Sequence, residues 1–464
     1  MRSKSYKELR EAAEDMWLVD CHEHIGYEHK MDGRELDLFG MLKASYAMID
    51  IMAAGASTEL YLNPPKDKRK RWEAIAPFLP KVQGTAYYRC MLRVFRDLFD
   101  LEGDEINESN WQELDRRILE YPKRPDWYHY VMKDRAKIDV AIHGDEAGDV
   151  DFKYYRPIMA TMVWLFARAI PQSRLKKVAE DTSIPLSERM RIPVNVFGMN
   201  PSEALRKNFE NLFGVPEDFD DFVSKLHREM KRRADTGTIG VKIPIAYFRA
   251  LRFEDVPEAE ARRLFNKPDD EITALEFVKV QDFVAHEIVR RCRELNLVVQ
   301  VHTGIQAGIG NYLEKSHPLH LENMFLAYPE VTFDVFHGGY PYCGEIGVAA
   351  KSFPNVYLDF CWMPIISPSA TIRHLREWIE TVPNSKLLWG GDAHTPEEGY
   401  GTAVFARDTV ARTLADAVDD DYISMKTAHE LARMILRENA LALFGIQIDE
   451  STRYLAPKKA KPNG

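Results

Sequence analysis

The sequence predicts an α/β fold, a distorted TIM-type (β/α)8 barrel made by a single domain of residues 1–464 with helical insertions. Two observations predict this fold. Short apolar runs alternate with segments of helical periodicity, which is typical of parallel strands joined by right-handed helical crossovers. Along the whole chain these runs add up to eight strands, the number of a closed barrel, and insertions readily extend such a barrel beyond about 400 residues.

Composition narrows the classes of function. Apolar residues make up 45% and charged residues 29% of the chain, as in ordinary globular proteins. The formal net charge of -10 argues against nucleic acid or an anionic membrane as a partner, because phosphate binding needs a basic face. No apolar run is long enough to span a bilayer, and residues 1–15 lack the apolar core of a signal peptide. The five cysteines are scattered, which indicates free thiols and a cytoplasmic location.

The N-terminal half begins with one predicted helix and one predicted strand. Residues 4–16 have helical periodicity, and an apolar strand then ends at Cys21. A charged loop covers residues 26–37, and apolar residues on one stripe predict a single helix over 41–54.

Two charged helical insertions interrupt this half, at 64–137 and 171–235. Strand signals lie at 138–142, 154–159 and 192–197. The barrel needs the first of these and only one of the last two to reach eight strands. We expect a homo-oligomer in which the acidic insertions supply the interface.

The C-terminal half is more regular. Apolar runs that predict five further strands are separated by helical segments, the clearest of which has apolar residues at spacings of three and four between 277 and 295. An open doubly wound sheet is the alternative fold, but no G-x-G-x-x-G or P-loop accompanies the first strand. The five runs cover residues 239–245, 297–301, 331–336, 356–360 and 386–389.

His22 and His24 follow the first strand directly. Residues i and i+2 of an extended strand point to the same face, so the two imidazoles can chelate one metal ion. Taken alone, the pair is also compatible with two ordinary structural histidines.

Other strand ends supply the remaining groups. In a barrel of this type the functional side chains lie at the carboxyl ends of the strands, so these groups should meet at one mouth. Histidines with a carboxylate suit Zn(II), with Mn(II), Fe(II) and Ni(II) left open. Each residue alone has a structural explanation, and their joint placement favours a metal site. The strand-end residues are Lys242, His302, His337 and Asp392.

This set of residues resembles the metal-dependent amidohydrolase superfamily, and within it the amidohydrolase-related group that includes nodulin-like domains. The helical segment 87–106 and the Tyr-Arg-Pro at 155–157 also resemble uronate isomerases. Two departures from the expected pattern are Arg249, one residue later than in the nodulin-like group, and His394. The matching stretches are 241–247 (VKIPIAY), 301–304 (VHTG), 337–341 (HGGYP) and 356–360 (VYLDF).

The resemblance implies a role for each residue. His22, His24, His302 and Asp392 would hold one divalent ion that lowers the pKa of water and polarises a carbonyl. Asp392 would accept the proton of the water, and His337 would stabilise an oxyanion or protonate a leaving group.

Lys242 allows two interpretations. In some members of the superfamily that the chain resembles, a lysine on the fourth strand is carboxylated and bridges two metal ions. A carboxylated Lys242 would do the same. We favour an ion pair with a substrate carboxylate, because Tyr247 and Arg249 follow on the same segment. Further candidates for substrate binding are Arg156, Tyr340 and Trp362, since arginine suits carboxylates and aromatic rings suit flat apolar groups, although packing or a surface ion pair explains them equally well.

These residues together predict a metal-dependent hydrolase that cleaves a C–N, ester or lactone bond in a small, carboxylate-bearing substrate. The same ligands also serve a decarboxylase or a uronate-type isomerase, so the sequence does not separate these reactions. A non-catalytic scaffold is the third hypothesis, and it predicts lost ligands, which the sequence does not show.

Overall fold

The computed structural model describes residues 2–31, 36–145, 150–168, 170–193 and 201–454. Its eight strands form one sheet in chain order, and each strand pairs in parallel with the next, which confirms the predicted barrel. The strands are β1 (Leu18–Glu23), β2 (Ile138–Asp145), β3 (Tyr155–Ala160), β4 (Gly240–Ile243), β5 (Val298–His302), β6 (Phe333–Phe336), β7 (Val356–Asp359) and β8 (Leu387–Leu388).

Main-chain hydrogen bonds between β1 and the segment after β8 bring the two edges of the sheet together. Cys21 N donates to Trp389 O at 3.0 Å, and Asp392 N donates to His22 O at 2.8 Å. Strand β8 has only two residues, so the segment that follows it makes much of this contact. The closure places residues about 370 positions apart in the sequence side by side at the barrel mouth.

The third barrel strand is β3, so the predicted strand at 154–159 is the one that the barrel uses. Residues 194–197 of the other candidate lie outside the described residues, and Ile192 and Pro193 are not in a strand. Strand β4 starts at a glycine for a steric reason: a Cβ on Gly240 would lie 2.7 Å from the carbonyl oxygen of Val298 on the neighbouring strand.

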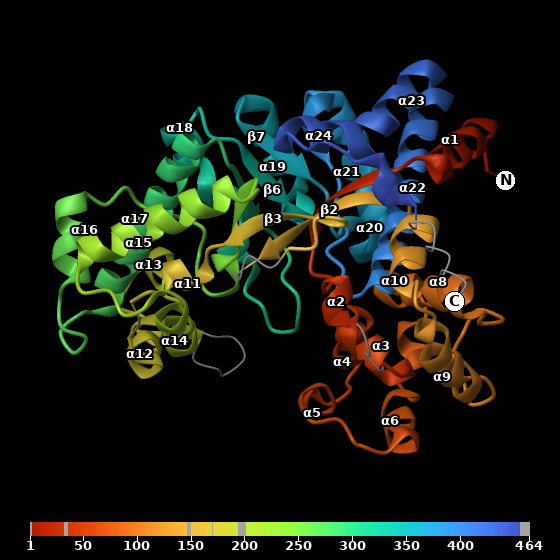
Figure 1. Ribbon diagram of the computed structural model, residues 1–464, viewed down its shortest axis with the longest axis horizontal. Coiled ribbons are helices and arrows are strands. Elements are labelled where there is room, and N and C mark those ends of the chain that lie inside the picture. The colour runs from red at the N-terminus through yellow and green to blue at the C-terminus, as the bar shows by residue number, and fades with distance from the viewer. Residues whose placement is uncertain (1, 32–35, 146–149, 169, 194–200, 455–464) are drawn as a thin grey trace, which may run out of the picture.

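Helices surround the sheet, and the long segment between β1 and β2 forms a helical block at one side of it (Figure 1). That block contains α2 (Glu28–Met31), α3 (Leu38–Ala44), α4 (Ala47–Ala53), α5 (Thr58–Leu62), α6 (Lys68–Ile75), α7 (Leu79–Val82), α8 (Ala86–Phe99), α9 (Trp111–Glu120) and α10 (Trp127–His129), and α1 (Lys4–Asp15) precedes it. Between β3 and β4 lie α11 (Met162–Leu165), α12 (Gln172–Glu180), α13 (Leu186–Arg189), α14 (Pro201–Phe213) and α15 (Phe219–Asp235).

The regular half of the barrel follows β4. Its helices are α16 (Glu258–Phe265), α17 (Ala274–Leu295), α18 (Glu322–Ala327), α19 (Cys343–Ser352), α20 (Met363–Ile366), α21 (Pro368–Thr381), α22 (Pro396–Asp419), α23 (Met425–Arg433) and α24 (Asn439–Phe444). Helix α17, the clearest in the sequence, begins at a capping box of Thr273 and Glu276 and ends at Asn296, whose φ of 53° is left-handed. Within the described ranges, no helix has the length and apolarity needed to cross a membrane.

The single helix predicted over 41–54 is wrong, because the structure has two helices, α3 and α4, with a break at Ser45 and Tyr46. Ser45 is extended (φ -99°, ψ 169°), and its hydroxyl donates to Leu42 O at 3.0 Å. The freed amide of Tyr46 donates to the carboxylate of Glu398 at 3.1 Å. Serine is well suited to such a break because its side chain competes with the helical main-chain hydrogen bonds.

Candidate metal centre

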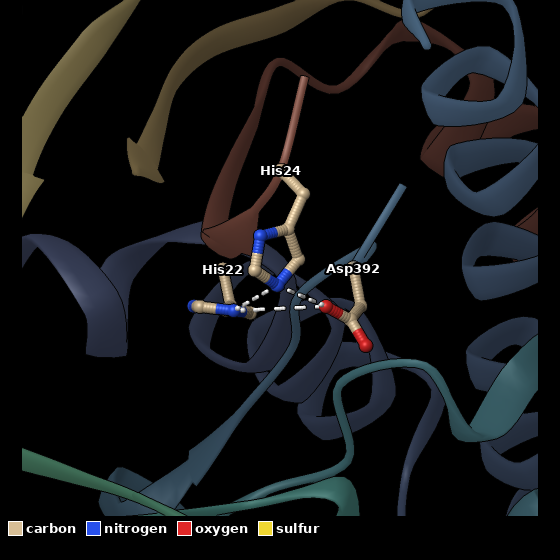
Figure 2. Close-up of side chains that lie close together, drawn as sticks. All are labelled: His22, His24 and Asp392. Carbon is tan, nitrogen blue, oxygen red and sulfur yellow. Dashed lines mark hydrogen bonds and ion pairs between the residues drawn. The ribbon is translucent and has the colours of Figure 1, made fainter. Parts of the chain in front are cut away.

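His22, His24 and Asp392 converge on one point at the barrel mouth (Figure 2). The Nε2 atoms of the two histidines are 3.3 Å apart, and Asp392 Oδ1 is 3.6 Å from the Nε2 of His22 and 3.3 Å from that of His24. One potential ligand atom from each residue lies within 4.8 Å of the others. The two strand ends therefore bring together, at one point, the three side chains that are predicted as metal ligands.

The main chain fixes this geometry through two glycines before Asp392. A Cβ on Gly391 would lie 2.2 Å from Glu23 Oε1, and one on Gly390 would lie 2.9 Å from the main-chain nitrogen of His22. Only glycine lets the segment after β8 approach β1 this closely. Asp392 itself has a left-handed φ of 58°, which directs its side chain toward the histidines.

Tyr46 holds the carboxylate of Asp392 from the other side. Its buried hydroxyl donates to Asp392 Oδ2 at 2.9 Å and lies 2.8 Å from the carbonyl oxygen of the same residue. Burial raises the pKa of Asp392 to about 6, against the opposing effect of the positive charge of Lys242. The break between α3 and α4 is thus what positions this tyrosine over the site.

Lys242 on β4 contacts both histidines. Its Nζ lies 2.7 Å from the Nε2 of His22 and 3.1 Å from that of His24. An ammonium group can only donate, so both rings accept at Nε2 and carry their own proton at Nδ1. Burial lowers the pKa of Lys242 to about 8, and burial followed by the lysine charge lowers the pKa of His22 well below its usual value. Two neutral imidazoles therefore direct lone pairs at a cation.

His302 and His337 form the opposite half of the site. His302 Nε2 is 3.0 Å from the carbonyl oxygen of Ile305, and its Nδ1 is 3.0 Å from His337 Nε2. His337 Nδ1 is in turn 3.2 Å from the carbonyl oxygen of Cys361, and its Nε2 is 3.9 Å from Asp392 Oδ2. The structure thus brings His302 beside the cluster but directs neither of its nitrogens at His22 and His24, and its predicted role as a ligand stays a prediction.

The donor set fits a divalent cation. Two imidazole nitrogens and one carboxylate oxygen, with the imidazoles held neutral by burial, are the ligand types and protonation states that Zn(II) and similar ions require. The Lys242 contact also shows that these lone pairs attract positive charge. His22, His24 and Asp392 would hold the ion.

Three of the predicted substrate residues lie around the cluster. The Tyr247 ring is centred 4.7 Å from that of His302, and the Trp362 ring is 5.3 Å from that of His337. The carbonyl oxygen of Tyr340 accepts from Ile305 N, which lies in the loop that also contacts His302.

Besides Lys242 and these three, two further residues were predicted to bind substrate, and the structure does not bring them to the cluster. Arg249 is fully buried and makes an ion pair with Asp282 on α17 at 2.7 Å. Arg156 lies near the start of β3 and donates to the carbonyl oxygens of Phe152 and Tyr155, at the opposite end of the strand from the site.

The sequence reasoning missed two residues of the site. His143 follows the predicted strand 138–142, and its positive charge would lower the pKa of His22, so it lies close enough to act on the cluster. The rule that selected His302 would have selected His143 too. Tyr46 had no such signal, because its position depends on a break inside an otherwise helical pattern. His394, noted as unexpected, stacks on His24 with ring centroids 5.5 Å apart.

The (β/α)8 barrel gathers histidines from the end of its first strand and an aspartate from the segment after its last strand at one mouth, where such barrels carry their functional groups. The family model "Amidohydrolase" matches residues 207–446 of the chain, more than half of its length. The chain therefore belongs to the amidohydrolase family, and it has the fold of an enzyme of that superfamily.

Two curated proteins are similar in sequence to this chain. The chain is 32% identical to protein fluG of Emericella nidulans over 225 residues, which are 46% of this chain and 26% of that protein. It therefore spans about a quarter of the length of this relative. It is 19% identical to the uronate isomerase of Thermotoga petrophila over 459 residues, 93% of this chain and 95% of that one.

Solved structures superpose on this barrel along nearly the full length of both chains. The uronate isomerase of Thermotoga maritima superposes with a TM-score of 0.73 at 16% identity, covering 96% of this chain and 98% of that one. A putative metal-dependent hydrolase of Lactobacillus casei gives 0.61 at 17% identity, covering 94% and 97%. At these identities the likeness establishes the fold.

Proposed function

We propose that the protein is a metal-dependent hydrolase that cleaves a C–N, ester or lactone bond in a small, carboxylate-bearing substrate. The observation that carries this proposal is the convergence of two neutral imidazoles and the Asp392 carboxylate beside a buried ammonium group. A divalent cation held there, with zinc as the first choice, supplies Lewis acidity and lowers the pKa of water.

The side chains of the site have complementary tasks in such a reaction. Asp392, with a carboxylate held by the hydroxyl of Tyr46, accepts the proton of the attacking water. His337, 3.9 Å from Asp392 Oδ2, is placed to donate to the developing oxyanion or the leaving group. The ammonium group of Lys242 attracts the carboxylate of the substrate, and Tyr247 and Trp362 line the wall against which its apolar part lies.

The test combines a variant with product analysis. Turnover of the purified enzyme, whose metal content is first measured by elemental analysis, is screened on amides, lactones and γ-glutamyl compounds. With the active substrate, solvent 18-O enters the product once per turnover if the reaction is hydrolysis, after correction for exchange. Asp392→Asn should abolish that turnover, and retained activity would refute the role proposed for Asp392.

Aldose–ketose isomerisation of a sugar acid is the second candidate function. Its support is the similarity to uronate isomerases over nearly the whole chain, which includes the helical insertions. Decarboxylation is a further reaction that the same ligands serve. Neither isomerisation nor decarboxylation requires an oxygen atom from solvent, so the isotope measurement separates both from hydrolysis. Release of CO2 then separates decarboxylation from isomerisation.

The proposed setting of the enzyme is a cytoplasmic homo-oligomer. The cytoplasmic location is supported by the free, buried state of all five cysteines, which suits a reducing compartment. Sedimentation of the purified protein tests the oligomer, and fractionation of the cells that make the protein tests the location.

A further inference from the structure

A surface groove outside the barrel mouth has six arginines among its eleven lining residues. It lies between α1, α8 and α22, with α1 and α8 each packed against α22, and has a volume of about 320 Å³. A volume of this order suits a small molecule. Its charged lining consists of Arg2, Arg10, Arg89, Arg93, Arg96, Arg412 and Asp408.

The groove has an excess of positive charge. Among the ion pairs of the described chain, two carboxylates are each shared by two of these arginines: Asp104 pairs with Arg89 and Arg96, and Asp408 pairs with Arg2 and Arg412. The other two arginines pair with one carboxylate each, Arg10 with Glu14 and Arg93 with Asp97. Six guanidinium groups therefore face four carboxylates, in a protein whose formal net charge is -10.

The one acidic residue in the lining is already occupied. The hydroxyl of Tyr6 donates to Asp408 Oδ1 at 2.5 Å, in addition to the two arginines that pair with this carboxylate. Asp408 therefore offers little repulsion to an incoming anion. The arginines themselves remain accessible, since the side chains of Arg89, Arg93 and Arg96 are 33%, 43% and 35% exposed.

The convergence of these arginines comes from the tertiary fold. Arg89, Arg93 and Arg96 form one stripe of α8 at spacings of four and three, whereas Arg10 comes from α1, Arg412 from α22 and Arg2 from the segment before α1. Helix α8 presents Tyr87 on a different face, toward Tyr46 at a ring distance of 5.3 Å. The groove is thus separate from the candidate metal centre.

We propose that this groove binds a small anion that carries two or more phosphate groups. Guanidinium groups match phosphate oxygens in a bidentate geometry, and several of them from different helices match an anion with several charged groups better than a single carboxylate. The charge excess and the size of the groove both favour a compact, multiply charged ligand over a macromolecule.

Inorganic pyrophosphate is the probe, titrated calorimetrically into the intact protein at about 0.15 M salt. We expect saturable binding with a dissociation constant of about 100 μM or lower, which the double variant Arg93→Gln/Arg96→Gln weakens about tenfold. The matched control is Arg116→Gln/Arg124→Gln, which removes two arginines that are 52% and 43% exposed and pair with Glu113 and Asp126, and it should change binding less than about twofold.

Three results would overturn the proposal. The absence of saturable binding of pyrophosphate up to about 10 mM would refute the proposed site. Equal weakening by the control variant would show a general charge effect. Binding of citrate as tight as that of pyrophosphate would reject phosphate as the preferred group. Thermal unfolding of each variant, expected to match the parent because the substituted side chains are at the surface, ensures that a loss of binding is not a loss of fold.

Discussion

The two halves of the candidate site differ in how their hydrogen-bonding protons balance. In the half made by β1 and the segment after β8, the Nε2 lone pairs of His22 and His24 lie 3.3 Å apart, and the ammonium group of Lys242 donates to both of them. In the half made by β5 and β6, three contacts run from Ile305 O through His302 and His337 to Cys361 O. Both ends of this second row are carbonyl oxygens, which only accept.

The row through His302 and His337 is one proton short. Three hydrogen bonds need three protons, and two neutral imidazoles supply two. Burial lowers the pKa of His302 to about 3, so a third proton is not held near neutral pH. One contact therefore sets two lone pairs against each other, and a cation that takes one of them would relieve the repulsion. In the first half three potential ligand atoms already converge, whereas the second half has a spare lone pair that a turn of the His302 ring would make available.

Removal of one chelating histidine should have the largest effect. We expect His22→Ala to weaken zinc binding about 10³-fold, or about 4 kcal/mol, because it removes one of three converging ligand atoms. His302→Ala should weaken binding only about tenfold if this residue supports the site without joining it. Competition with a fluorescent chelator measures both affinities. Equal losses would show that His302 turns and becomes a direct ligand, as the family resemblance implies.

Acid should destabilise the fold through His302, in the half of the site made by β5 and β6. The folded pKa of His302 is about 3, mainly because of burial and then because of Lys242, whereas the unfolded value is near 6.5. As the pH falls below 6.5, the unfolded chain binds a proton that the folded chain does not, so the free energy of unfolding decreases. From pH 7.5 to pH 5 this one residue contributes a loss of about 2 kcal/mol.

Urea unfolding at the two pH values, followed by tryptophan fluorescence, measures this loss. A chelator is present throughout, so that release of metal does not contribute. His302→Gln should show a pH-dependent loss smaller by about 2 kcal/mol. An unchanged pH dependence in this variant would mean that His302 is not held neutral by its surroundings.

Much of the barrel and the first half of the site followed from the sequence, because both depend on local patterns. Alternation of apolar runs and helical segments predicts parallel strands, and strand ends gather at one mouth whatever the loops contain. The His22 and His24 pair is set by the two-residue period of a strand. Asp392 could be placed because it lies in the short segment after the last strand.

The direction of side chains beyond the strands did not follow from the sequence. After β4 a short 3-10 turn (Ile245–Tyr247) directs Tyr247 toward His302 but leaves Arg249 facing Asp282 on α17, so neighbours in the sequence have different surroundings. Tyr46 reaches Asp392 only because the helix breaks next to it and Glu398, about 350 residues away, accepts its amide proton. Such contacts depend on tertiary packing, which periodicity does not encode.

Substitution of Lys242 tests whether its ammonium group competes with the metal ion. Both cations use the Nε2 lone pairs of His22 and His24, so Lys242→Met should strengthen zinc binding about tenfold, or about 1.4 kcal/mol. Lys133→Met is the matched control, since Lys133 is also buried with a pKa lowered to about 8 by burial but donates to Asp139 O. Its zinc affinity should stay within about twofold of the parent. Weaker binding in Lys242→Met would instead identify the lysine as a carboxylated ligand.

Removal of the Tyr46 hydroxyl should have an effect of about the same size, on turnover instead of on metal affinity. Tyr46→Phe keeps the ring packed on Trp362, at a centroid distance of 4.4 Å, and deletes only the hydrogen bond to Asp392 Oδ2. A buried hydrogen bond to a carboxylate is worth about 1 to 2 kcal/mol, so we expect kcat to fall about tenfold with little change in KM. Because the hydroxyl also lowers the pKa of Asp392, the acid limb of the pH–rate profile should move to higher pH in the variant. A fall in kcat without that movement would indicate that Tyr46 orients the site as a whole and not the Asp392 carboxylate.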